Sequence, residues 1–103
     1  MQEIIKILDK FVQDRNWSQF HTGSELARAL SIEVAELNEL FLFYRQADIN
    51  KIKEELADVL IYSLLLANRF NLDIKKIILE KIEMNAKKYP VSKFKGSNKK
   101  YNQ

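Results

Sequence analysis

Several residue types that define common kinds of binding site are scarce or absent in this sequence. The 103 residues include no cysteine, which excludes disulfides and thiolate metal sites. The only histidine is His21, so the Glu-x-x-His pairs of di-iron helix bundles cannot form, and no EF-hand loop occurs. Two glycines and one proline offer little of the turn chemistry that a multi-stranded sheet requires. The scarcity of glycine and proline therefore favours a helical fold over a multi-stranded sheet.

Long apolar runs and a strong excess of one charge are also missing. The longest apolar run, 59–67, is interrupted by Tyr62 and Ser63 and is too short to span a bilayer. Met1–Lys10 mixes charged with apolar residues, so we expect no signal peptide, no membrane partner and a cytoplasmic location. The formal net charge of +3 is too small to indicate nucleic-acid binding by itself. The length and the 47% hydrophobic content indicate one small globular domain.

Apolar residues recur at helical spacing along four segments, and each segment is predicted to be a helix. The third is apolar on nearly all sides, and a chain this short can hardly bury such a helix alone. We therefore expect an all-α fold of four helices in which a partner subunit covers the third. The predicted helices are Gln2–Arg15, Ser24–Gln46, Ile52–Phe70 and Ile74–Lys88.

The segments between these helices contain cap and turn residues. Ser24 is expected to cap the second helix, and Asp48 or Asn50 the third. Pro90 ends the fourth helix, and the basic residues that follow it are expected to be extended. The segment between the first two helices, which contains Trp17, is interpreted as a loop. The predicted divisions of the chain are a helical domain, 1–90, and a basic C-terminal tail, 91–103.

Two pairs of carboxylates, each three residues apart, lie within the second and third predicted helices. The pairs are Glu33 with Glu36, and Glu55 with Asp58. Residues at i and i+3 of a helix point to the same side, so two such helices packed together would gather four carboxylates. Carboxylates held together away from water require a compensating cation, and oxygen ligands suit Mg²⁺ or Mn²⁺.

Acidic pairs of this spacing are also common on solvated helix faces, and the spacing alone leaves that interpretation open. However, Glu33 falls within the apolar stripe of its helix, and the second pair lies on a helix with almost no polar face. Buried unpaired carboxylates are costly, so these positions favour a metal site. Hard-metal chemistry on a phosphate substrate fits such a site.

Two further groups could bind other parts of a nucleotide. Trp17, Phe20 and His21, in the predicted loop, could stack on a base, or they could simply anchor the loop. Lys81, Asn85 and Lys88 recur on one face of the fourth helix. They could bind a triphosphate beside an acidic metal site, or they could form a solvated face.

Together these residues resemble the MazG-like superfamily of all-α nucleoside triphosphate pyrophosphatases, and within it the dCTP pyrophosphatase branch. The resemblance extends over nearly the whole chain, in order and at compatible spacing. It is carried by Arg15–His21, Glu33–Phe41 and Glu55–Tyr62, by Lys81, Asn85 and Lys88–Pro90, and by Gly96, Ser97, Lys100 and Tyr101 of the tail.

The resemblance implies a Mg²⁺-dependent hydrolase that cleaves a nucleoside triphosphate into the monophosphate and pyrophosphate. It implies a preference for dCTP or a modified dCTP and a role in cleansing the nucleotide pool. It also implies a four-helix bundle-like core that is completed by oligomerisation, as a dimer or as a dimer of dimers, which is a tetramer. By resemblance, the metal-binding and catalytic residues are Glu33, Glu36, Glu55 and Asp58, and the substrate-binding residues are Trp17, His21, Phe43, Tyr62, Lys81, Asn85 and Lys88.

Two positions depart from the family pattern. Lys88 stands where arginine is usual, and a lysine loses the bidentate geometry toward phosphate. Phe43 stands where the dCTP branch tends to carry tryptophan, so it keeps a stacking face and loses the indole N–H. This change widens the expected substrates to include dATP or dTTP.

Two other classes of protein are alternatives. One is a catalytically silent helical module that binds nucleotides or assembles with other subunits, although all four carboxylates of an active member are present. The other is a nucleic-acid-binding protein that uses Lys93–Lys100, which the low net charge disfavours.

Overall fold

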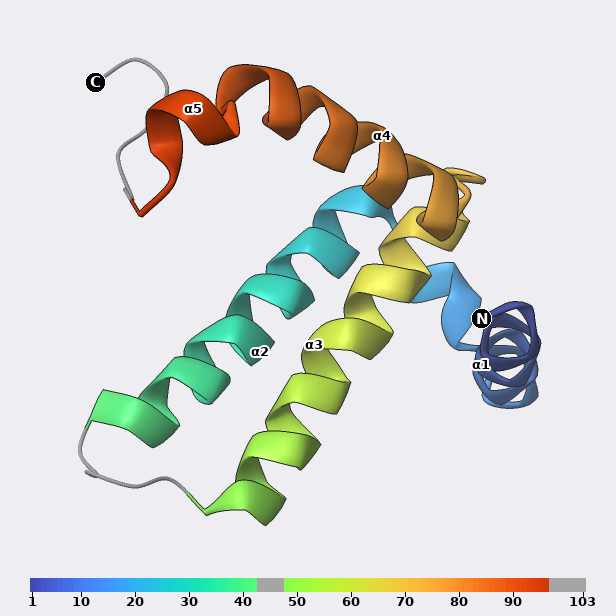
Figure 1. The fold of residues 1–103 in the computed structure, drawn as a ribbon. Coiled ribbons are helices and arrows are strands. Elements are labelled where there is room, and N and C mark those ends of the chain that lie inside the picture. The colour runs from blue at the N-terminus through green and yellow to red at the C-terminus, as the bar shows by residue number, and fades with distance from the viewer. Residues whose placement is uncertain (43–47, 97–103) are drawn as a thin grey trace. The chain divides into compact units, whose positions relative to one another are not determined.

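The computed structural model describes residues 1–42 and 48–96. In that part of the chain all regular structure is helical and no strand occurs, which confirms the predicted all-α fold (Figure 1). The chain divides into two compact units, Met1–Leu72 and a second unit that begins at Asp73. The predicted division after residue 90 stays a prediction. None of the described helices combines the length and the apolar character that crossing a bilayer requires.

The first unit contains three α-helices and one short 3₁₀ helix, labelled η1. α2 and α3 run antiparallel, side by side, and share the most extensive packing in the unit (Figure 1). α1 packs against α3, where the Asn68 side-chain amide donates a hydrogen bond of 2.8 Å to the Asp9 carboxylate. The elements are α1 (Gln2–Asp14), η1 (Trp17–Phe20), α2 (Gly23–Leu42) and α3 (Ile49–Arg69).

The buried interior is small. Among the described residues, only Val12, Leu26 and Ala67 are buried, one from each of α1, α2 and α3. No helix of the first unit is therefore enclosed on all sides. Large apolar side chains remain exposed on the two antiparallel helices, a pattern typical of surfaces that another protein covers. On α2 and α3 these exposed residues are Ile32, Val34, Phe41, Leu42, Ile49, Leu56 and Leu60.

Gly23 allows a close approach between the start of α2 and the residue that follows α3. A Cβ atom at this position would lie 2.8 Å from Cζ of the Phe70 ring. The predicted cap of α2, Ser24, is wrong, because the helix begins one residue earlier. The hydroxyl oxygen of Thr22 instead accepts a hydrogen bond of 3.2 Å from the Glu25 N–H.

α3 begins at Ile49, three residues before the predicted start at Ile52, whereas the other described helix boundaries lie within one residue of the predictions. Of the two candidate caps of α3, Asp48 is confirmed: its carboxylate accepts a hydrogen bond of 2.9 Å from the Asn50 N–H. The first helix ends at Asp14, one residue before the predicted end. The predicted loop that follows it contains a helical turn, η1. The end of the predicted second helix, at 43–46, lies outside the described residues.

The second unit contains α4 (Ile74–Lys88) and the short α5 (Val91–Phe94). α4 has the predicted bounds, and its cap is Asp73, whose carboxylate accepts a hydrogen bond of 3.0 Å from the Lys76 N–H. The prediction that the chain is extended from residue 91 is wrong for α5. Pro90 ends α4, but its carbonyl oxygen then accepts a hydrogen bond of 2.9 Å from the Lys93 N–H and begins a new turn.

Candidate functional site

Three of the four predicted metal ligands face one another between α2 and α3. One carboxylate oxygen from each of Glu33, Glu55 and Asp58 lies within 4.8 Å of the other two. The spacing of three residues places Glu55 and Asp58 on one side of α3. The packing of α2 against α3 brings Glu33 to the same point. We call these three residues the acidic cluster.

Two oxygens of the acidic cluster are buried without a hydrogen-bond partner. They are Oε2 of Glu33 and Oε2 of Glu55. A buried polar atom that has lost water and gained no partner is costly. A hard divalent cation would supply the missing partner, and an oxygen-only ligand set suits Mg²⁺ or Mn²⁺. The chemistry of the cluster therefore fits such a cation.

The electrostatics of the cluster lead to the same conclusion. Burial raises the pKa of Glu33, and contact with the Glu36 carboxylate and the charges of Asp58 and Glu55 raise it further. Burial also raises the pKa of Glu55, with additional contributions from Glu36, Asp58 and Glu54. The neighbouring negative charges thus disfavour ionisation of Glu33 and of Glu55. Glu36 acts on both glutamates but lies outside the three-oxygen group, and its role as a ligand stays a prediction.

A pocket of about 310 Å³ adjoins Asp58. Trp17 and His21 line it from η1 and from the residue after η1, whereas Asp58 and Tyr62 line it from successive turns of α3. Four predicted site residues therefore meet in one pocket, and Asp58 connects this pocket to the acidic cluster. The remaining lining residues are apolar: Ile7, Leu8, Phe11, Val12, Ile61 and Leu65.

The contribution of α1 to this pocket was not predicted from the sequence. The Phe11 ring lies beside Trp17 in an edge-to-face arrangement, with 5.7 Å between the ring centroids and 73° between the planes. Phe11 is 44% exposed, so it forms part of a pocket wall and not of the core. The helical spacing of Phe11 places it on the apolar side of α1. Spacing alone, however, cannot distinguish a residue of the core from a residue of a pocket.

The other predicted substrate residues do not belong to this pocket's described lining. Lys81, Asn85 and Lys88 lie on α4 of the second unit, at intervals that place them on one side of the helix. Phe43 lies outside the described residues. The roles of these four residues stay predictions.

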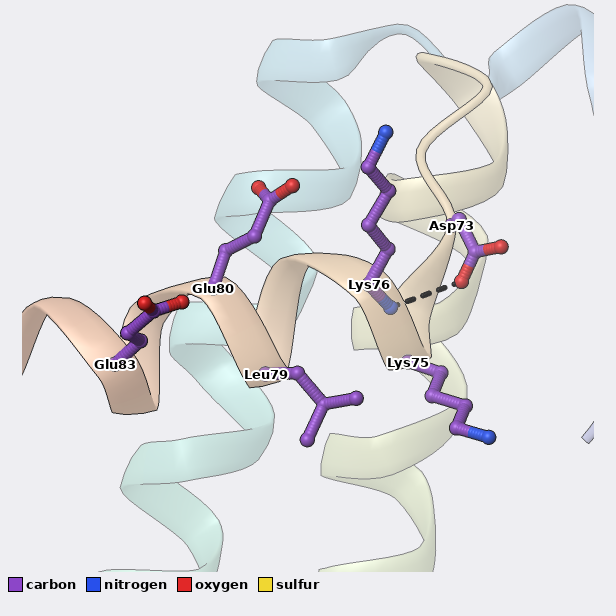
Figure 2. A pocket seen from close by; sticks show the side chains of 6 residues that line it. All are labelled: Asp73, Lys75, Lys76, Leu79, Glu80 and Glu83. Carbon is purple, nitrogen blue, oxygen red and sulfur yellow. Dashed lines mark hydrogen bonds between the residues drawn. The ribbon is translucent and has the colours of Figure 1, made fainter.

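A second pocket lies on the first turns of α4 (Figure 2). Its charged groups have both signs, and Lys75 and Lys76 point to opposite sides of the helix. Asp73 accepts the helix-capping hydrogen bond described above. Because these groups do not converge on one point, the pocket resembles a solvated helix start and not a binding site. It is lined by Asp73, Lys75, Lys76, Leu79, Glu80 and Glu83.

Two kinds of sequence comparison identify proteins that are similar to this chain. The model of the MazG-like family matches residues 25–103. dCTP pyrophosphatase 1 of Rattus norvegicus is 35% identical, and that of Homo sapiens is 33% identical, each over 98% of this chain. The chain spans 65% of the length of each of these two relatives.

A solved structure is similar to this chain as well. The crystal structure of a pyrophosphatase from Archaeoglobus fulgidus matches with a TM-score of 0.81 and 38% sequence identity. The match covers 87% of this chain and 92% of the archaeal chain. The resemblance predicted from the acidic pairs and the aromatic segment is thereby confirmed. This chain belongs to the MazG-like family.

Proposed function

We propose that this protein is a nucleotide pyrophosphohydrolase that uses Mg²⁺ or Mn²⁺ to cleave a nucleoside triphosphate into the monophosphate and pyrophosphate. The observation that carries the proposal is the position of Asp58, which belongs both to the acidic cluster and to the wall of the pocket. A base held between Trp17 and His21 would direct its phosphates toward the cluster. The names of the rat, human and archaeal relatives support the same reaction class.

The four carboxylates would hold the cation, which when bound neutralises charge on the phosphate oxygens. The attacking water has to lose a proton as it bonds to the α-phosphorus. We assign the orientation of that water, or the acceptance of its proton, to a carboxylate of the first pair, Glu33 or Glu36. The departing pyrophosphate requires cationic and amide donors. We assign this role to Lys81, Asn85 and Lys88 of α4.

The pocket supports a preference for a small base. The rings of Trp17 and Phe11 provide stacking surfaces, and His21 is the lining side chain best suited to hydrogen-bond a base edge. A pocket walled by large aromatic rings favours a small pyrimidine over a purine. We therefore propose dCTP or a modified dCTP as the preferred substrate, and removal of unwanted nucleotides from the cytoplasmic pool as the role.

The proposed activity is tested by measuring pyrophosphate release from a panel of the four common dNTPs and 5-methyl-dCTP, with Mg²⁺ and with EDTA. Mg²⁺-dependent release, fastest with a dCTP, would support the proposal. A catalytically silent nucleotide-binding module would quench the Trp17 emission on addition of nucleotide but release no pyrophosphate.

Replacing the pocket's aromatic residue and its histidine should separate affinity from base discrimination. Trp17→Ala is expected to raise KM for every nucleotide alike, by roughly 5- to 150-fold, because stacking on an aromatic ring contributes about 1–3 kcal/mol per base. His21→Ala is expected to narrow the difference in kcat/KM between dCTP and the other dNTPs. Steady-state kinetics on the dNTP panel measure both effects.

The matched control for this pair is Phe20→Ala, which removes an exposed ring of η1 that does not line the pocket. It should leave the kinetics unchanged. An unaltered ranking of the dNTPs in His21→Ala would show that His21 does not read the base.

We also propose a homo-oligomer, a dimer or a tetramer, that covers the exposed apolar side of α3. Sedimentation at micromolar concentration is expected to show no folded monomer for the wild type. Leu60 is 54% exposed, so Leu60→Glu should place a charge in the covered surface and shift the protein toward smaller species. Lys53→Glu, at an exposed charged position of the same helix, is the control. A folded wild-type monomer at this concentration would contradict the proposal.

A further inference from the structure

The corner between α1 and η1 sets the position of Trp17. Asn16, immediately before Trp17, has left-handed backbone angles, with φ at 58°. Asparagine tolerates this conformation better than most residues. The corner is closed by the Asn16 N–H, which donates to the Gln13 carbonyl at 3.0 Å, and by the Gln19 side-chain amide, which donates to the Asn16 carbonyl at 2.9 Å. The chain thereby turns Trp17 back toward Phe11.

Arg15 makes three contacts with this aromatic pair. Its guanidinium carbon lies 3.6 Å from the centroid of the Phe11 ring and 5.9 Å from that of Trp17. Its Nη1 donates a hydrogen bond of 3.0 Å to the Phe11 carbonyl oxygen. Arg15 itself is exposed and does not line the pocket. The guanidinium therefore lies over a pocket ring from outside the pocket wall.

We propose that Arg15 is a positioning residue for the nucleotide pocket. The cation lies on the face of the Phe11 ring, and the hydrogen bond to the Phe11 carbonyl fixes the guanidinium in that place. The ring of Phe11, held in this way, supports Trp17 in its edge-to-face contact and so keeps the indole face available to a base. This inference rests on the proposed function of the pocket and extends it to a residue that the substrate does not touch.

A purely structural role for Arg15, as an exposed side chain at the end of α1, makes a different prediction. It would affect the stability of α1 but not the orientation of Trp17. Trp17 is the only tryptophan of the chain, so the emission of the free protein reports directly on this corner. This fluorescence measurement requires no substrate and no turnover.

The experiment compares the wild type with Arg15→Met, Phe11→Leu and the double variant, with Arg28→Met, at an exposed position of α2, as the control. Arg15→Met keeps a long apolar side chain and removes the cation and its hydrogen bond. It is expected to shift Trp17 emission to the red, to lower its anisotropy, and to raise KM by about threefold to tenfold with kcat changed less than about twofold. Arg28→Met should match the wild type in all these readings.

The double variant decides whether Arg15 acts through Phe11. If it does, Arg15→Met has little further effect on KM or on emission once Phe11 is leucine. Equal effects of Arg15→Met on both backgrounds, or an unchanged Trp17 emission in Arg15→Met, would overturn the proposal. Absence of pyrophosphate release by the wild type would instead overturn the proposed function, and the emission measurements would still decide the role of Arg15.

Discussion

Replacing Asp58 by asparagine is expected to lower kcat/KM by at least about 100-fold while the helical content stays that of the wild type. An amide keeps the shape of the side chain but removes the ligand charge, and even residues that only support a metal ligand cost about 10–100-fold. Asp58 should be especially sensitive because it belongs to both the acidic cluster and the pocket. Glu36→Gln is expected to abolish activity as well. Pyrophosphate release and far-ultraviolet circular dichroism measure the two parts of this prediction.

The matched control is Glu39→Gln, which lies about one turn after Glu36 on α2. The Glu39 side chain is exposed and lies outside the acidic cluster. It makes the same chemical change and should retain wild-type kinetics. Wild-type turnover in Asp58→Asn would show that the metal assignment is wrong. Wild-type turnover in Glu36→Gln alone would remove Glu36 from the proposed ligands and leave the three residues of the cluster.

Glu55→Gln is expected to stabilise the metal-free protein and to reduce the stabilisation that Mg²⁺ provides. Without metal it should raise the melting temperature, because it removes one of several mutually repelling carboxylates around a buried oxygen. In the wild type, Mg²⁺ at 100 times its Kd should stabilise the fold by about 2.7 kcal/mol, which corresponds to a rise on the order of 10 °C for a domain of this size. Glu55→Gln should abolish most of this rise. Thermal melts with EDTA and with Mg²⁺ measure both effects.

The raised pKa values of Glu33 and Glu55 determine how this stability depends on pH. A carboxyl group with a raised folded-state pKa binds its proton more tightly in the folded than in the unfolded state. The metal-free protein should therefore gain stability from these two groups as the pH falls through the raised folded pKa values. This gain in stability should level off once the pH is below 4.5, the ordinary pKa of a glutamate.

Protons and metal compete for the same oxygens, so the Mg²⁺-induced rise in melting temperature should shrink over the same pH range. Glu25→Gln, at an exposed position at the start of α2, is the control for both pH series. A Mg²⁺-induced rise that is independent of pH, or that persists in full in Glu55→Gln, would contradict the assignment of the acidic cluster to the metal.

The sequence by itself determined the features that depend on local spacing. Apolar periodicity predicted α4 with the bounds that the structure has, and α1 to within one residue, because the repeat of an α-helix is a property of the backbone. The spacing of Glu55 and Asp58 likewise determined that they point the same way. Asp48 could be identified as one of two candidate caps of α3 because a short acceptor side chain before a helix satisfies its free N–H groups.

Only the tertiary structure decided which helix faces meet. Glu33 and Glu55 are 22 positions apart, and their meeting depends on the packing of α2 against α3, which neither pair encodes alone. The same holds for Phe11: its place in an amphipathic stripe is local information, but its place in the pocket depends on the turn at Asn16 and on α3. Spacing sets the direction of a side chain on its own helix, whereas its surroundings come from segments distant in the chain, through packing that no single segment determines.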